Sequence, residues 1–452
     1  MLQIASFVIT FVALVIIFKS RKYEQGLSTL VPVSLFNIPL VSLGNSASAG
    51  IFPIDIIVWV FLLRFFVLSK SRSIFTAYQI NSTYLLTILV CYALLRGIYV
   101  VLFDDYQYYD RFILYGMYRW LFFLYIFLIF IRIYPGENFD KLLCNLSYVL
   151  IIYFSFAIVH QLGIVDLSGW SATGYENVYE IEYLFKDVSR AFLGNNAATI
   201  GCISMFGILL GLLIYKSRKN VAQLILLLAL ISFIGCGSRS DFVGAIFALI
   251  VWFICFGTAK YLMIIIKSSI VLLVLGLFIS GLSDYLYGFN RLLETDFIGE
   301  ASGQSEGTFA YRVYWWEGII EHFLDDVFHL FFGYGPNGFR MLSVNKISQM
   351  SFGHNVYLHT LGELGLIGLF IFILFLMRIL MLFIFNYPYR KGANSLLISL
   401  AGFYILQRLF AGISVDSILA VDNMIAMTVT FFFIVAAALS TLKKDAMGYK
   451  YY

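Results

Sequence analysis

Residues 362–386 read GELGLIGLFIFILFLMRILMLFIFN, and Glu363 and Arg378 are the two charged residues in this stretch. About 20 apolar residues in a helix cross the roughly 30 Å of hydrocarbon in a bilayer. Similar apolar runs of at least about 18 residues recur from one end of the chain to the other, and a soluble core has no need for a dozen of them. The sequence therefore predicts an all-α polytopic membrane protein.

Composition supports this class. The chain has 452 residues, of which 61% are hydrophobic and 12% charged, whereas soluble domains carry about 25% charged residues. The apolar runs predict about thirteen transmembrane helices. We expect them near residues 2–18, 27–43, 51–68, 82–102, 112–133, 142–162, 191–215, 220–236, 239–257, 261–281, 362–386, 393–413 and 422–441.

The distribution of basic residues orients these spans. If the N-terminus lies outside and the C-terminus inside, cytoplasmic segments hold roughly 16 basic against 4 acidic residues, and outer segments roughly 8 against 20. This is the bias that the positive-inside rule expects. Three parts follow: residues 1–281 with a minor outer loop at 163–190, a large outer loop at 282–361, and residues 362–452 with the last three spans and a short cytoplasmic tail.

The large outer loop contains one stretch with helical periodicity. Apolar residues recur at helical spacing from Val313 to Phe332, with two tryptophans near the start, which predicts an amphipathic helix in the membrane interface. His322 and Asp326, like Asp325 and His329, stand four residues apart on this helix. No known ligand motif is present, so we expect a solvated helix face and no metal site.

Charges inside apolar spans are costly and therefore informative. Arg64 and Arg378 lie near predicted cytoplasmic ends, where snorkelling accounts for them. Arg96, Arg119 and Arg408 each lie a turn or two below the outer surface. They either snorkel outward or together form an anion site for a phosphate group, which guanidinium binds in a bidentate way.

Two short motifs at the predicted outer face carry further candidates. Arg239 lies in Gly235-Cys236-Gly237-Ser238-Arg239-Ser240, a hairpin whose glycines allow a tight turn. Arg239 is either an interfacial arginine paired with Asp241 or a functional cation. His354 in Gly353-His354-Asn355-Val356-Tyr357-Leu358 is either a general base or an interfacial histidine with a structural hydrogen bond.

Four pieces of sequence occur in one order. They are Arg190-Ala191-Phe192-Leu193-Gly194-Asn195-Asn196, the Ser238-Arg239-Ser240 turn, Arg312 ahead of Gly333-Tyr334-Gly335-Pro336-Asn337-Gly338, and His354-Asn355 leading to Glu363-Leu364-Gly365. Over about residues 180–385 this series resembles the O-antigen ligase and polymerase superfamily of bacterial inner membranes.

The resemblance implies a glycosyltransferase of the GT-C type, which uses glycans carried on undecaprenyl diphosphate and works at the periplasmic face without a cofactor, metal or nucleotide sugar. It implies that Arg239 and Arg312 hold the diphosphate and that His354 prepares the acceptor, as the catalytic residues. Arg190, Asn196, Asn355 and Glu363, with Arg96, Arg119 and Arg408, are the residues we expect to bind diphosphate or glycan. Membrane lipid, a chain-length regulator and a flippase are the expected partners, with no nucleic acid.

Two enzymes of this superfamily differ in their acceptor. A polymerase moves a growing chain onto a new lipid-linked repeat unit, and a ligase moves the finished chain onto lipid A-core. Chain length, richness in Phe, Ile and Tyr, and a loose match to the motifs favour the polymerase. The non-enzymatic alternative is a flippase for lipid-linked oligosaccharides, although flippases usually show repeat symmetry and charged sites deep in the bundle.

Overall fold

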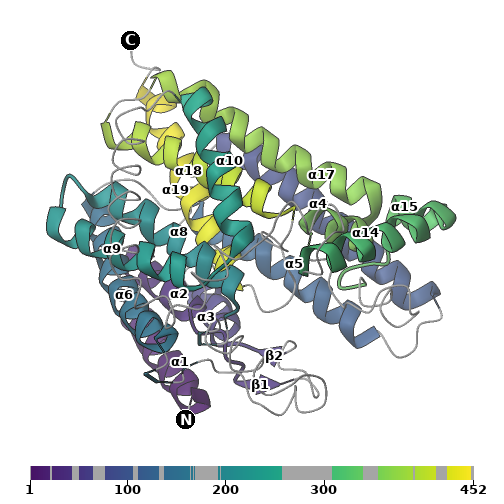
Figure 1. The fold of residues 1–452 in the computed structure, drawn as a ribbon, viewed down its shortest axis with the longest axis horizontal. Helices are drawn as coiled ribbons and strands as arrows, with labels where there is room; N and C mark the ends of the chain where they lie inside the picture. Colours follow the sequence, from purple (N-terminus) through teal and green to yellow (C-terminus); the bar gives the residue numbers. More distant parts are fainter. Residues whose placement is uncertain are drawn as a thin grey trace.

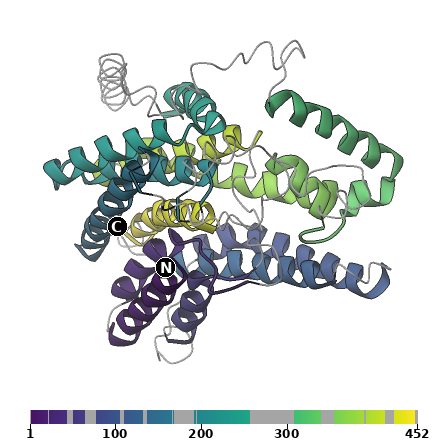
Figure 2. The ribbon, with the colours of Figure 1, turned by 60° about the horizontal axis from the view of Figure 1, so that its bottom comes forward.

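The protein is a bundle of long helices (Figures 1 and 2). The computed structural model describes residues 2–20, 23–42, 50–64, 77–104, 110–131, 137–162, 164, 165, 167, 192, 193, 195–256, 308–338, 355–389, 392–413 and 425–448. Within them, eight helices are long and apolar enough to cross a membrane. The predicted class, an all-α polytopic membrane protein, is confirmed.

The helices follow the predicted spans closely. The elements that match these spans are α1 (Leu2–Lys19), α4 (Ala77–Phe103), α5 (Asp110–Phe130), α6 (Glu137–Gln161), α8 (Ala197–Ile214), α9 (Lys219–Gly235), α10 (Arg239–Phe256), α17 (Val356–Asn386), α18 (Gly392–Ala411) and α19 (Ile425–Gly448). A short 3-10 turn, η4 (Tyr387–Tyr389), follows α17. The span expected near 261–281 lies outside the described residues, so the number of thirteen spans stays a prediction.

The second predicted span is shorter in the structure, and the third is described only as far as residue 64. Helix α2 (Tyr23–Ser34) ends two residues after Pro32, because proline removes a backbone donor and crowds the preceding turn. Irregular chain then leads to a two-stranded antiparallel ribbon, β1 (Val41–Ser42) with β2 (Gly50–Ile51). Helix α3 (Pro53–Leu62) follows at once, starting with a proline where its missing N–H is not needed.

Helix α19 is the centre of the bundle. Every residue of Ile425–Leu442 is buried, and Figure 2 shows this yellow helix surrounded by the others. Phe433 lies edge-on to Phe130 and Phe206, with ring centroids 5.5 and 5.8 Å apart. Because lipid tails are as apolar as these side chains, close packing rather than the hydrophobic effect holds such helices together.

The predicted amphipathic helix is two helices. Helix α14 (Thr308–Asp325) stops at Asp326, whose side chain accepts from the His329 backbone N–H and so caps α15 (Val327–Phe332). Helix α15 packs against α17 and lies beside it in Figure 1. The described part of the large outer loop is thus joined to the bundle, while residues 257–307 lie outside the described residues and the division into three parts stays a prediction.

Candidate functional site

The α9–α10 hairpin carries Arg239 at the first position of α10. Gly237 has a φ of +58°, which glycine adopts without strain, so the tight turn predicted here is confirmed. The hydroxyl of Ser238 donates to Asp241 over 2.5 Å and closes the first turn of α10. The side chain of Arg239 is partly buried.

A fully buried ion pair lies under this hairpin. Asp241 and Arg408 are both 0% exposed, and a guanidinium nitrogen of Arg408 donates to a carboxylate oxygen of Asp241. The amide of Gln407 donates to the same oxygen over 3.1 Å and accepts from Arg408 Nε over 2.6 Å. Snorkelling is therefore the wrong account of Arg408, since its charge is matched inside the protein.

Helix α17 is broken at Gly365, whose φ and ψ are +64° and −172°. The break leaves backbone carbonyls without helical partners, and these must be satisfied inside a membrane protein. Residues 333–338, here called the 333–338 turn, meet that need: Tyr334 N donates to the Gly362 carbonyl and Gly335 N to the Glu363 carbonyl, both over 2.8 Å. A Cβ on Gly333 would collide with the Glu363 carbonyl, so the two backbones approach too closely for a side chain.

Glu363 sits at the break with 1% of its surface exposed. Its Oε1 accepts from Asn337 N over 2.7 Å and lies 3.1 Å from His359 Nε2, and its Oε2 accepts from the Trp120 indole over 3.4 Å. The carboxylate therefore ties the 333–338 turn to α5 and α17. These contacts explain why Glu363 is buried, and the glycan-binding role expected for it stays a prediction.

Arg96 holds the other side of the 333–338 turn. Its Nε donates to the Gly333 carbonyl over 2.9 Å, and one terminal nitrogen lies 3.6 Å from Asp104. The guanidinium carbon lies 4.9 Å from the Tyr99 ring centroid and 5.2 Å from that of Phe328, a favourable cation–π arrangement. Arg96 is 5% exposed, so it reaches protein groups rather than snorkelling to water.

Arg119 belongs to a second buried ion pair. It is 0% exposed and donates to Asp55 over 2.5 Å, to the Tyr115 hydroxyl over 2.6 Å, and to the Gly50 carbonyl over 3.4 Å. Asp55 also accepts from Phe52 N over 2.8 Å and thereby caps α3. The three arginines expected to share one anion site thus each have their own partners, and snorkelling is wrong for Arg119 as well.

Two asparagines of the predicted site cap helices. Asn196 accepts from Thr199 N over 2.9 Å at the start of α8. Asn355 accepts from Tyr357 N over 2.9 Å and Leu358 N over 3.1 Å at the start of α17. Both contacts satisfy backbone donors that a helix N-terminus leaves open. Their neighbours Arg190 and His354 lie outside the described residues.

Arg312 lies near the start of α14 and is partly buried. Further along, α14 and α15 bring together a chain of polar side chains. His322 Nε2 shares a 2.5 Å hydrogen bond with the Tyr334 hydroxyl, which donates to Asp326 over 3.3 Å, and His329 Nδ1 lies 2.6 Å from the same carboxylate oxygen. The His329 and Tyr334 rings stack with centroids 4.0 Å apart. This chain fastens the α14–α15 junction to the 333–338 turn.

The electrostatics of the junction follow from these bonds. Partial burial would by itself raise the pKa of Asp326, but hydrogen bonds from the His329 backbone and ring and from Tyr334 outweigh it and lower the pKa. Among the described residues, no three His, Cys, Asp or Glu side chains are arranged to hold a metal ion.

The buried arginines were not connected with their partners from the sequence: Asp55 was not singled out, and Asp241 was considered only as a partner of Arg239. Asp55 and Asp241 lie within predicted spans, and an acid inside an apolar run was the available signal. Their pairing could not be inferred, because Asp55 and Arg119 are 64 positions apart and Asp241 and Arg408 are 167. His359 and Tyr334 were also missed, and no pattern distinguishes either from an interfacial aromatic residue.

The fold and these sites define a polytopic helical membrane protein with buried ion pairs and a broken helix at one end of its bundle. Residues 224–373 match the O-antigen ligase family. No curated protein matches the sequence. The match covers about a third of the chain, including the Arg239 hairpin, α14, the 333–338 turn and the break in α17, and it confirms the resemblance to the O-antigen ligase and polymerase superfamily. It supports a glycosyl-transferring protein of the ligase or polymerase type.

Proposed function

We propose that the protein polymerises the repeat units of a bacterial surface polysaccharide. It transfers a growing glycan from undecaprenyl diphosphate to a sugar hydroxyl of another lipid-linked repeat unit, at the periplasmic face of the cytoplasmic membrane. The observation that carries the proposal is the family match over 224–373, because this stretch contains Arg239, Arg312 and His354.

The residues suit the chemistry of this transfer. An acceptor hydroxyl forms a bond to the anomeric carbon while the bond from that carbon to the diphosphate oxygen breaks, so negative charge grows on the leaving undecaprenyl diphosphate. Arg239 and Arg312 stabilise this charge, and His354 takes the proton of the acceptor hydroxyl. Fixed cations act strongly here because they need no reorganisation during the reaction.

The scaffold around Arg239 supports the assignment. Asp241 lies two residues along the first turn of α10 and is bound by Ser238, Gln407 and Arg408. The backbone that carries Arg239 is therefore anchored to α18 by buried hydrogen bonds. Because Asp241 is neutralised by Arg408, it weakens the field of Arg239 less than an unpaired carboxylate would.

A ligase is the second candidate, and the description of the matched family favours it. Both enzymes need the same diphosphate site and differ in acceptor.

Deleting the gene in its host and resolving the extracted lipopolysaccharide on a gel separates them. A ladder reduced to core plus one repeat unit supports the polymerase. Loss of every O-antigen band, with long chains kept on undecaprenyl diphosphate, supports the ligase. An unchanged ladder contradicts both for this polysaccharide, and repeat units trapped inside the cell point to a flippase.

Substitutions test the diphosphate site. We expect Arg239→Ala and Arg312→Ala each to abolish chain assembly at normal protein level, and Arg312→Lys to restore little, since a point charge lacks the bidentate fork. Arg218→Ala is the matched control, because Arg218 is exposed in the turn between α8 and α9. Normal assembly in either alanine variant would overturn the diphosphate site.

A further inference from the structure

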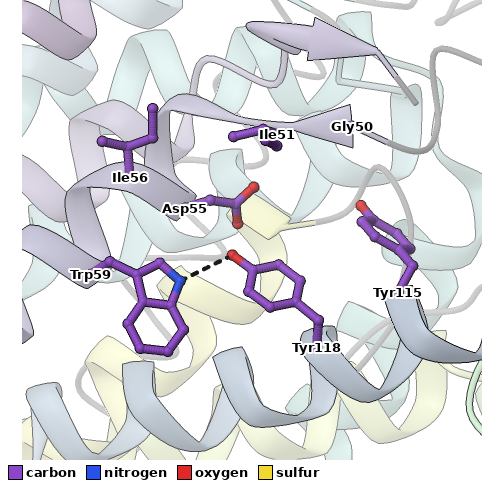
Figure 3. Close-up of a pocket in the computed structure, with 7 residues that line it drawn as sticks. All are labelled: Gly50, Ile51, Asp55, Ile56, Trp59, Tyr115 and Tyr118. Carbon is purple, nitrogen blue, oxygen red and sulfur yellow. Dashed lines mark hydrogen bonds between the residues drawn. The ribbon is translucent and has the colours of Figure 1, made fainter.

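A pocket with a volume of about 510 Å³ lies between β2, α3 and α5. Figure 3 shows Trp59 and Asp55 from α3 facing Tyr115 and Tyr118 from α5, with Gly50 and Ile51 of β2 along one edge. The volume lies within the roughly 300–1,000 Å³ typical of small-molecule sites. Of the described residues, neither Arg239 nor Arg312 lines it.

The walls of this pocket are aromatic. Trp59 is 44% exposed, an unusual exposure for so large a ring, and the edge-on ring of Tyr125 supports it with centroids 5.2 Å apart. Tyr118 lies across from it, and the Trp59 indole donates to the Tyr118 hydroxyl over 3.4 Å. That distance is long for an N–H···O bond, so a ligand hydroxyl can replace it at little cost.

The polar edge of the pocket carries no net charge. Asp55 is neutralised by Arg119, and the Arg119 donors are already directed to Asp55, to the Tyr115 hydroxyl and to the Gly50 carbonyl. A phosphate would need an uncommitted cation, which this ion pair does not supply. The chemistry therefore fits an uncharged ligand that has both C–H faces for stacking and hydroxyls for hydrogen bonds.

The pocket also lies close to the matched family segment. On α5, Gly116 follows Tyr115 and packs so closely on the 333–338 turn that a Cβ would lie 2.6 Å from the Pro336 carbonyl carbon. Trp120, next to Arg119, reaches Glu363. One helix thus separates the pocket from the break in α17, and both α3 and α5 start at ends predicted to face outside.

We propose that this pocket binds a neutral sugar ring of the lipid-linked glycan, stacked on the ring of Trp59 with its hydroxyls on the Tyr118 and Asp55 edge. The site rests on the proposed function for its source of sugar. It gives the protein a glycan subsite apart from the diphosphate arginines, and so a place to select among repeat units.

The test uses the full-length protein in lipid nanodiscs and saturation-transfer NMR with methyl glycosides of glucose, galactose, mannose and N-acetylglucosamine. We expect at least one glycoside to bind the wild type, and Trp59→Leu to weaken this binding by about 5-fold, in line with the strength of aromatic stacking. Trp59→Phe keeps a ring and should retain binding. Tyr84→Leu is the control, because Tyr84 is 63% exposed on α4 outside the pocket.

Each outcome bears on the inference. Equal glycoside signals from wild type and Trp59→Leu would overturn it. Normal glycan assembly in cells that carry Trp59→Leu would overturn it as well. Leucine keeps an apolar wall but no ring, so retained assembly is the result expected for a hydrocarbon chain in the pocket. The proposed function is tested separately by Arg239→Ala, which should abolish assembly and leave glycoside binding unchanged. Assembly that survives this substitution while Trp59→Leu still loses binding would refute the diphosphate site and keep the pocket, and gene deletion tests the function itself.

Discussion

Two carboxylates are buried in the described part of the family-matched segment, and they are stabilised in different ways. Asp241 faces the guanidinium of Arg408 and is 0% exposed. Glu363 is 1% exposed and is bound by a backbone N–H of the 333–338 turn and by the Trp120 indole, with His359 beside it. The first is an ion pair between helices, and the second is the centre of a backbone junction.

This difference predicts which kind of substitution should destabilise each region. An ion pair in a medium of low polarity is sensitive to charge, because removing one partner leaves the other buried and uncompensated. A junction in which two backbones touch is sensitive to volume, because a single added carbon has nowhere to go. The substitutions below separate these two modes.

The largest effect is expected from breaking the ion pair. Asp241→Ala leaves the Arg408 charge buried without its partner and should lower the free energy of unfolding by about 3–5 kcal/mol. For a chain of this length that is a fall in Tm of roughly 3–5 °C. Thermal unfolding in detergent, followed by intrinsic fluorescence, measures it. The double variant Asp241→Leu with Arg408→Met removes both charges and should recover most of the loss. A double variant less stable than Asp241→Ala would mean that the pair is not held by charge.

The junction between the 333–338 turn and α17 should be destabilised by added side-chain volume. Gly333 has a φ of +73° and abuts the Glu363 backbone, so Gly333→Ala combines left-handed strain with a collision and should cost about 2–4 kcal/mol. Gly392→Ala is the matched control: its φ is +65°, but no atom lies within 4 Å of the added carbon. It should cost only about 1–2 kcal/mol. The two melting temperatures measured side by side decide this, and equal losses would exclude the collision.

Much of the fold could be predicted from the sequence because membrane spans are set by local composition. Helices α4 to α6 and α17 to α19 fall close to their predicted ranges. The prediction failed where a few residues outweigh an apolar run. Pro32 shortens the second span, and Asp326 divides the amphipathic helix by capping α15.

The site was less predictable because its partners are distant in sequence. The arginines inside spans were correctly singled out as unusual, yet neither alternative weighed for them was pairing of Arg119 with Asp55 or of Arg408 with Asp241. The 333–338 turn was recognised as a turn, but its docking into a broken helix depends on Gly365, some thirty positions away. Contacts of this kind follow from tertiary packing, which single-sequence periodicity does not encode.

A smaller effect is expected at Glu363 itself. Glu363→Gln keeps the shape of the side chain and one acceptor oxygen, but its NH₂ group cannot accept from a second donor. Either Asn337 N or the Trp120 indole then loses its acceptor, and we expect a cost of about 1–2 kcal/mol. Trp120→Phe removes the indole donor, so the two substitutions combined should cost less than the sum of the singles in unfolding measurements. Strict additivity would show that the indole contact contributes nothing.

The smallest effect concerns a third carboxylate, Asp326, which is partly exposed and lies between the histidines of α14 and α15. Its pKa is lowered from an ordinary value of 3.8. A depressed pKa means that the charged form is favoured by folding, so its contribution is full above the ordinary pKa and is lost as pH falls through the folded value. Asp326→Asn can still accept the capping bond from His329 N, but it removes the charge and the second oxygen that accepts from the Tyr334 hydroxyl. The difference in Tm between wild type and Asp326→Asn should therefore persist down to about pH 5 and shrink below about pH 4.

Asp325→Asn, at an exposed neighbouring position, is the control. A difference that grew as the pH fell would show that the charge of Asp326 opposes the folded junction, and the polar chain from His322 to His329 would then not be what fastens the 333–338 turn.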